Sequence, residues 1–223
     1  TGKELAARAI HKLSTTENSK TPIKVDCGLI PSKIAESELF GSVKGAFNDA
    51  PDRPGPFEIA KGGTVFLDEI GEMDYNIQHK LLTVIQDRVL CRVGSTKEIK
   101  VDANIICATN QKIGSEDSEK QFRNDLYHRI GRDVIKLPSL NQRKDDIPAL
   151  FKYFIKKLNK KWGEEIEDVL NDEAAKELMA YDWKIGNIRD LENVISRAFE
   201  PLVLENERNS TDKCFIKDFD LSI

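Results

Sequence analysis

Hydrophobic positions are spaced differently in the first and second parts of the chain. Four short segments rich in β-forming residues lie in the first part, at 23–25, 64–67, 101–108 and 134–137. An apolar run without alternation, as at 64–67, predicts a strand buried on both faces of a parallel sheet. From Leu140 onward, apolar residues recur at helical spacing instead. The pattern predicts an α/β unit followed by an all-helical unit.

Helices, a hairpin and a loop are predicted between the strands. Helical spacing of apolar residues predicts helices at 5–11, 32–39, 76–89 and 122–130. Gly94-Ser95 is a turn signal and predicts a hairpin over 92–100. Glycines and prolines mark 41–56 as a projecting loop. Within it, Phe47 is either an exposed anchor for a partner or a side chain folded back onto the core.

Polar residues mark the expected helix starts in the second part. We expect Asp172 to cap a helix over 173–181. We expect Asn187 to cap the next helix, with Asp190 at its third position as in a capping box. Arg189 falls in the first turn of that helix, where a cation opposes the helix dipole. Its position suggests that it interacts with an external anion.

Two carboxylates, Asp68 and Glu69, directly follow the apolar run at 64–67. In open α/β sheets, ligands bind outside the carboxyl ends of the strands. A carboxylate there holds the water shell of Mg²⁺, and its neighbour polarises an attacking water. Two solvated acids that open a turn would explain the same residues. Asn110 ends the next predicted strand, where it either orients a water or serves a turn.

A Gly-Lys pair stands at the start of the first predicted helix, in Thr1-Gly2-Lys3-Glu4. A helix N-terminus presents free N–H groups to a phosphate, and Lys3 adds a positive charge. The pair matches the last half of a P-loop, with Glu4 where Ser or Thr is commoner. An ordinary helix start is the alternative.

Composition restricts the function classes. The 223 residues carry a net charge of -4, so the chain has no overall basic footprint for nucleic acid. No apolar run reaches the roughly 18 residues of a membrane span, and the four cysteines are scattered without the spacing of a zinc site. We therefore expect a cytoplasmic protein with reduced thiols and no membrane contact.

Several motifs occur in one fixed order along the chain. They stand at 36–41, 45–47, 62–73, 92–94, 108–110, 122–126 and 186–193. Together with the Gly-Lys pair, these motifs resemble the AAA+ ATPase domain of sigma-54-dependent bacterial transcription activators, from Thr1 to about Pro201. The resemblance implies an AAA+ P-loop three-layer α/β sandwich with a parallel sheet over 1–139, a small all-helical lid over 140–204, and a linker or tail over 205–223.

The resemblance also implies roles for the candidate residues in binding and hydrolysing ATP. The implied nucleotide-site residues are Gly2, Lys3 and Glu4 at the end of the P-loop, Asp68 for Mg²⁺ through water, Glu69 for the attacking water, Asn110 as first sensor, Arg123 and Arg129 as arginine fingers acting on a neighbouring subunit, and Arg189 as second sensor on the lid. Family members form ring hexamers. Hydrolysis moves the loop that carries Gly45, Ala46, Phe47, Asn48, Asp49 and Ala50 against sigma-54 RNA polymerase.

Three positions depart from the family pattern. The partner loop usually reads Gly-Ala-Phe-Thr-Gly-Ala, so Asn48 and Asp49 change its tip and put sigma-54 engagement in question. Asp26 stands where the family has a switch Asn that couples Glu69 to the nucleotide state. Residues 183–187 lack the usual Pro and carry one extra residue, which could shift Arg189.

Two other functions remain open from sequence. One is a divergent member of the family that regulates transcription without sigma-54, and the other is a non-hydrolysing oligomeric scaffold. The first half of the P-loop does not stand in this chain, so we expect the chain alone to bind ATP poorly. We expect DNA contact only through a domain outside these residues.

Overall fold

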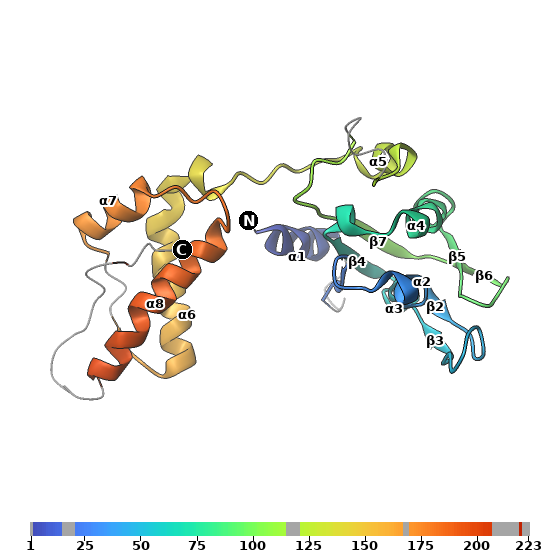
Figure 1. The fold of residues 1–223 in the computed structure, drawn as a ribbon, viewed down its shortest axis with the longest axis horizontal. Coiled ribbons are helices and arrows are strands. Elements are labelled where there is room, and N and C mark those ends of the chain that lie inside the picture. Colours follow the sequence, from blue (N-terminus) through green and yellow to red (C-terminus); the bar gives the residue numbers. More distant parts are fainter. Residues whose placement is uncertain (1, 15–20, 115–120, 167–169, 207–218, 220–223) are drawn as a thin grey trace. The chain divides into compact units, whose positions relative to one another are not determined.

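The computed structural model describes residues 2–14, 21–114, 121–166, 170–206 and 219. These residues form two compact units, Gly2–Ile135 and Lys136–Ile223. Figure 1 shows the first as a sheet with helices and the second as a group of helices. The predicted tail over 205–223 lies almost wholly outside the described residues.

A parallel sheet of three strands organises the first unit. The strands β1 (Ile23–Asp26), β4 (Gly63–Asp68) and β7 (Ala103–Cys107) stand in the order β1-β4-β7. Their register aligns Asp26 with Asp68 and Leu67 with Cys107, so the carboxyl ends of all three strands meet at one edge. Val65 and Leu67 are fully buried, as an apolar run without alternation predicts.

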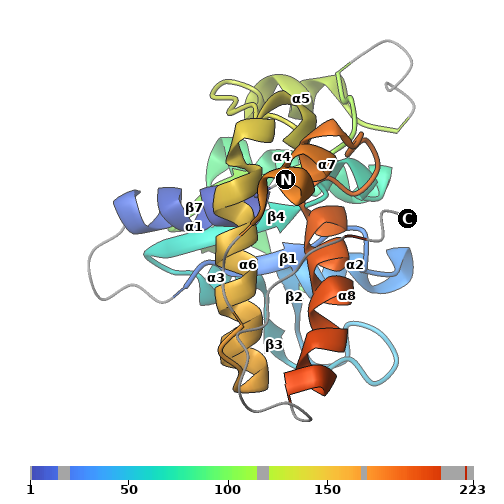
Figure 2. The ribbon, with the colours of Figure 1, turned by 90° about the vertical axis from the view of Figure 1, so that its left-hand side faces the viewer.

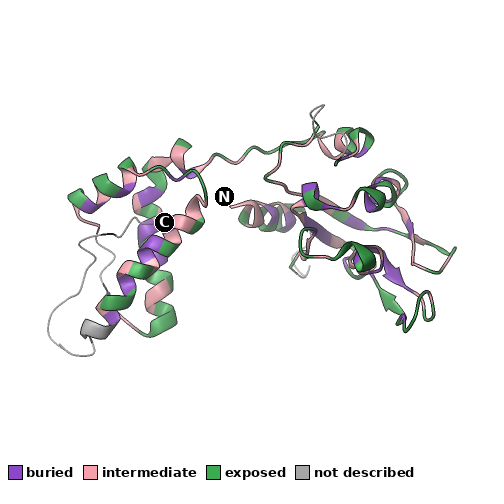
Figure 3. Ribbon diagram, viewed as in Figure 1, coloured by how far each residue is buried: buried purple, intermediate pink, exposed green. Residues whose placement is uncertain are grey.

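Helices cover this sheet and bury many of its residues, and Figure 3 colours buried residues purple. They are α1 (Lys3–Ser14), α2 (Ser32–Phe40), α3 (Pro56–Ile59), α4 (Tyr75–Asp87) and α5 (Asn124–Ile130), with a short 3₁₀ turn η1 (Ile70–Glu72). A buried hydrogen bond of 2.8 Å between His11 Nδ1 and Thr64 Oγ1 fixes α1 on β4. Helix α1 therefore begins beside the carboxyl edge of the sheet.

One predicted strand and the end of one predicted helix differ in the first unit. The predicted strand at 134–137 is an irregular segment, and Val134 and Ile135 are 63% and 65% exposed. No other described strand pairs with it, and an isolated strand leaves its N–H and C=O groups to water. The helix predicted over 76–89 ends at Asp87 because Arg88 adopts the left-handed conformation with φ 58°.

After the left-handed turn at Arg88, the hairpin begins at Val89, three residues before its predicted start at residue 92. Strand β5 (Val89–Cys91) pairs antiparallel with β6 (Glu98–Lys100). The projecting loop is closed at its base by a second small antiparallel pair, β2 (Gly41–Ser42) and β3 (Arg53–Pro54). Arg92, which follows β5, forms hydrogen bonds of 2.9 and 2.8 Å to both carboxylate oxygens of Glu58 and one of 3.0 Å to Asp52. This ion-pair cluster joins the hairpin to the base of the loop.

The second unit is all helical. It contains two 3₁₀ turns, η3 (Leu140–Gln142) and η4 (Lys144–Asp146), and the helices α6 (Ile147–Trp162), α7 (Asp172–Ala180) and α8 (Ile188–Asn206). Figure 2 shows α6 and α8 side by side. Trp183 lies fully buried among them, and its indole N–H donates to the Leu178 carbonyl at 2.9 Å.

The predicted cap of α7 is wrong, and the predicted cap of α8 is right in position but not in its side-chain contact. Asn171, not Asp172, caps α7, because its side chain accepts from Ala174 N at 2.7 Å. Asn187 does not form a capping box: it has φ 56°, and its side chain accepts from Leu140 N at 2.8 Å. Asp190 instead accepts from Gly186 N at 2.6 Å. A cap assigned from spacing alone fails when the side chain finds a more distant backbone donor.

Candidate functional site

The acidic turn after β4 lies at the carboxyl edge of the sheet, as predicted. Glu69 adopts a left-handed backbone conformation with φ 49°, which is uncommon for a residue with a side chain. Its Oε2 accepts a hydrogen bond of 3.0 Å from the backbone N–H of Asn110. The next residue, Ile70, donates its N–H to the Ala108 carbonyl at 2.9 Å. The turns after β4 and β7 therefore hold Glu69 between them.

Lys3 brings the first helix to the same place. Its ammonium group lies 2.5 Å from Glu69 Oε1, and both side chains are partly buried. Residues 66 positions apart in sequence thus form a direct ion pair. The structure brings together the Gly-Lys helix start, Glu69 and Asn110, which the sequence nominated separately. The side chain of Asn110 itself is exposed.

Lys24 is a site residue that the sequence did not reveal. From β1, its ammonium group lies 3.0 Å from Asp68 Oδ2 and 3.0 Å from Glu4 Oε2. These hydrogen bonds raise the pKa of Lys24 above its ordinary value, so the group stays positively charged. The Asp68 side chain is only 14% exposed. The contact follows from the register of the sheet, in which Lys24 pairs with Phe66, two residues before Asp68. No pattern in the sequence indicated it.

Asp26 lies at the same acidic edge. Among the described residues, no hydrogen bond joins it to Glu69. Its Oδ1 accepts from Gly28 N at 3.1 Å. Burial, and then the negative charges of Asp26, Asp68 and Glu69, together raise the pKa of the neighbouring Cys27 thiol to about 12. The effect on Cys27 indicates that the three carboxylates concentrate negative charge at this edge, with Lys3 and Lys24 as the cations that oppose it.

A second missed interaction joins the two turns of the site. Gln111 donates from Nε2 to Glu72 Oε1 at 2.6 Å. The Gln111 side chain packs closely against Gly71: a Cβ at Gly71 would lie 2.5 Å from the Gln111 side-chain oxygen. Since Gln111 directly follows Asn110, this contact ties the position of Asn110 to the turn that carries Glu69.

The candidate arginines occupy three different settings. Arg123 precedes α5 rather than lying within it, so the prediction of one helix carrying both arginines is wrong. It pairs with Asp125 at 2.7 Å, and its guanidinium lies 5.6 Å from the centre of the Tyr75 ring. Arg129 is exposed in α5, and no ion pair or hydrogen bond of its side chain is found within the described part of the chain. Arg189 is exposed in the first turn of α8, in the other unit.

The partner loop keeps Phe47 in contact with solvent. Its side chain is 44% exposed, which favours the exposed-anchor interpretation over the folded-back one. Ala46 packs against Gly94 of the hairpin, and Val43 N donates to the Val93 carbonyl at 3.1 Å. The hairpin therefore supports one side of the loop, while Phe47, Asn48 and Asp49 project.

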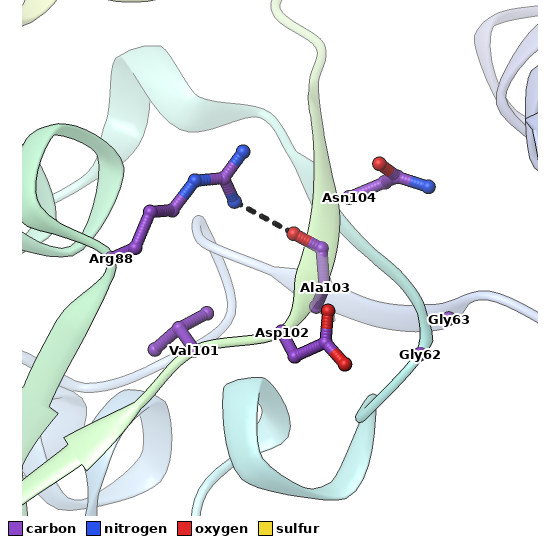
Figure 4. A pocket seen from close by; sticks show the side chains of 7 residues that line it. All are labelled: Gly62, Gly63, Arg88, Val101, Asp102, Ala103 and Asn104. Carbon is purple, nitrogen blue, oxygen red and sulfur yellow. Dashed lines mark hydrogen bonds between the residues drawn. The ribbon is translucent and has the colours of Figure 1, made fainter.

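A shallow polar pocket of about 230 Å³ lies at the opposite, amino end of the strands. Arg88 and Asp102 line it, together with the Gly62-Gly63 backbone at the start of β4 (Figure 4). Arg88 Nη1 donates to the Ala103 carbonyl at 2.8 Å. This hydrogen bond holds the start of β7 next to Arg88. The pocket is separate from the acidic edge.

Two negative findings apply to the described residues. They contain no group of three or more His, Cys, Asp or Glu side chains arranged to hold a metal ion. A magnesium ion that takes most of its ligands from phosphate and water needs no such group. Among the helices described, none is long and apolar enough to cross a membrane.

Comparisons with known proteins match both units. The model of the sigma-54 interaction domain matches residues 1–136, and that of the AAA+ ATPase lid domain matches residues 141–208. The chain is 46% identical to the DNA-binding transcriptional activator HyfR of Escherichia coli strain K12, over 89% of this chain and 29% of HyfR. It is 47% identical to the Nif-specific regulatory protein of Azospirillum lipoferum, over 89% of this chain and 31% of that protein. The chain thus spans less than a third of these relatives.

Solved structures agree on the fold. The crystal structure of NtrX from Brucella abortus in complex with ATP matches with a TM-score of 0.81 and 33% identity, over 99% of this chain and 48% of the other. Hsp104 of Saccharomyces cerevisiae matches with a TM-score of 0.64 at 17% identity, over 96% of this chain and 40% of the other, which shows likeness of fold alone. The predicted AAA+ architecture, a parallel sheet with helices and then a helical lid region, is confirmed.

Proposed function

Since this chain belongs to the family of AAA+ sigma-54 interaction domains, we propose that it is the ATP-hydrolysing core of a bacterial transcription regulator that remodels sigma-54 RNA polymerase. The observation that supports ATP chemistry best is the set of contacts at the acidic edge, where Lys3, Glu69 and the turn at Asn110 meet. Such a regulator works in the cytoplasm, where RNA polymerase acts, and in this family as a ring, for which we propose a hexamer.

The residues at this edge fit ATP and Mg²⁺. The start of α1, with Gly2, Lys3 and Glu4, would face the phosphates, and Asp68 would hold Mg²⁺ through water. The metal ion, when bound, neutralises phosphate charge. Asp68 suits this role because its carboxylate already interacts with a cation, the Lys24 ammonium group, which lies 3.0 Å from Oδ2. The domain boundary near residue 139 would separate this edge from the lid that contributes Arg189.

Glu69 would orient the attacking water and accept its proton. The water oxygen attacks the γ-phosphorus, the bond to the β–γ bridging oxygen breaks, and ADP and phosphate leave. Lys3 now pairs with Glu69. The Lys3 ammonium group must therefore move to the phosphates before Glu69 Oε1 is available to a water. The Asn110 side chain, which is exposed, would report the γ-phosphate, and Asp26 would take the place of the switch Asn. Arg123 and Arg129 would act on the ATP of the neighbouring subunit.

The decisive test uses the full-length protein. ATP hydrolysis is measured first, and retention of sigma-54 is then measured with a transition-state nucleotide analogue. We expect hydrolysis and analogue-dependent retention. Hydrolysis without retention would indicate a divergent member that does not use sigma-54. This outcome needs a test because Asn48 and Asp49 replace the Thr and Gly that the family usually has at the loop tip. Neither activity would indicate a scaffold.

Lys24→Met is expected to lower the Mg²⁺ concentration needed for half-maximal binding of a non-hydrolysable ATP analogue, by about three- to tenfold. The substitution removes a cation that competes with Mg²⁺ for Asp68 across 3.0 Å, an interaction that solvent partly screens. Arg8→Met is the matched control, because Arg8 pairs with Glu4 at 2.8 Å in the same network. An unchanged or higher Mg²⁺ requirement in Lys24→Met contradicts the competition.

Gly94→Ala is expected to reduce analogue-dependent sigma-54 retention about tenfold or more. A Cβ at Gly94 would lie 2.5 Å from the Ala46 Cβ, and the backbone has φ 80°, so the partner loop must shift. Gly62→Ala is the control: its φ is 72°, but no atom lies within 4 Å of the added carbon. Equal retention by the two variants would show that the hairpin does not position the loop.

A further inference from the structure

The tip of the partner loop is a tight turn, and backbone hydrogen bonds hold the residues on either side of it. Ala50 N donates to the Phe47 carbonyl at 3.0 Å, which closes a four-residue turn with Asn48 and Asp49 at its centre. Ala50 is buried, and Gly45 N donates to its carbonyl at 3.2 Å. The base is therefore fixed, and the two central side chains are exposed.

Asp49 occupies a backbone position that favours glycine. Its φ is 59°, at the third position of a turn that normally takes Gly or Asn. A residue with a side chain in this region carries backbone strain that glycine would not. Asn and Asp adopt this conformation more readily than other residues with side chains, but glycine would adopt it with less strain.

The Asp49 carboxylate also has no structural role within the described residues. It is exposed, and neither a hydrogen bond nor an ion pair is found for it there. The nearby acid Asp52 differs, because it pairs with Arg92 at 3.0 Å. Asp49 is thus a strained position with an unpaired negative charge, beside the half-exposed ring of Phe47.

We propose that Asp49 is a specificity residue of the partner loop, and that its carboxylate pairs with a lysine or arginine on the sigma-54 surface that receives Phe47. The inference rests on the proposed function. It assigns the apolar contact to Phe47 and the charge selection to Asp49. A partner surface that is apolar but lacks the cation is bound less well, because Asp49 then loses its water without gaining a partner.

The test compares Asp49→Asn, Asp49→Gly and Asp49→Lys in the full-length protein, with sigma-54 from the same bacterium and a transition-state nucleotide analogue. Asn and Gly both accept a positive φ, so they remove the charge without adding strain. We expect each to weaken sigma-54 binding about three- to tenfold at low salt, and Asp49→Lys to weaken it further. Binding of the wild type should fall more steeply with added salt than binding of Asp49→Asn.

Asp87→Asn is the matched control, since Asp87 is an exposed acid at the end of α4 for which no interaction is described. It should bind sigma-54 like the wild type. Binding of Asp49→Asn and Asp49→Gly that equals or exceeds wild-type binding overturns the inference and leaves the proposed function intact. If wild-type protein hydrolyses ATP and does not bind sigma-54, the proposed function fails and the inference fails with it.

Discussion

Glu69→Gln is expected to reduce the rate of ATP hydrolysis in the full-length protein by about a hundredfold to ten-thousandfold, the range typical of a lost general base. The amide keeps an oxygen that accepts the Asn110 N–H, so the turn geometry is retained. It removes the negative charge that now pairs with Lys3 across 2.5 Å. Lys3 is then free to face phosphate, so nucleotide binding should be equal to or tighter than that of the wild type.

Steady-state hydrolysis and binding of a fluorescent ATP analogue separate these two effects. Glu98→Gln serves as the control, because Glu98 is an exposed acid on β6, away from the acidic edge. It should leave both quantities unchanged. Hydrolysis by Glu69→Gln at the wild-type rate would remove Glu69 from the mechanism, and a large loss of nucleotide binding would instead make it a binding residue.

Arg129→Ala is expected to reduce hydrolysis by about 10³- to 10⁵-fold, the range found for a trans arginine that stabilises transition-state charge. Arg129 is exposed and unpaired within the described residues, so it is available to a neighbouring subunit. Arg123 has partners of its own in Asp125 and the Tyr75 ring. Replacing Arg123 should therefore also change local packing, and a lowered thermal midpoint is expected in that variant. Arg132→Ala, an exposed arginine three residues further on, is the control for charge alone.

Mixing the two inactive variants tests whether the arginine acts between subunits. A ring built from Glu69→Gln and Arg129→Ala subunits contains interfaces in which an intact Glu69 faces an intact Arg129. Hydrolysis should therefore return in the mixture, although neither variant is active alone. Mixtures that stay inactive while rings form, as judged by size-exclusion chromatography, would place Arg129 in its own subunit's site or outside the site.

Much of the fold follows from patterns that a single sequence displays. An apolar run without alternation ended at Asp68, and this is sufficient to predict that β4 is buried and that its acids lie at a ligand edge. Some predictions failed at the ends of helices, as at Asp172, and others failed because they depend on a distant partner. Residues 134–137 have the composition of a strand, but no described strand pairs with them. The Asn187 side chain accepts a hydrogen bond from the distant Leu140 N–H. Neither fact is encoded in local spacing.

By itself, the sequence determined the order of the elements, the carboxyl-edge position of Asp68, Glu69 and Asn110, and the glycines and prolines that make 41–56 a loop. These follow from residue periodicity and turn chemistry, which act over a few neighbouring residues. Only the tertiary structure decided the ion pairs, because they join residues far apart in the chain. Lys3 reaches Glu69, Lys24 reaches Asp68, and Arg92 reaches Glu58 only once the sheet has set its register. The same packing left Asp49 without a partner among the described residues, at a strained turn, a property that no local pattern reveals.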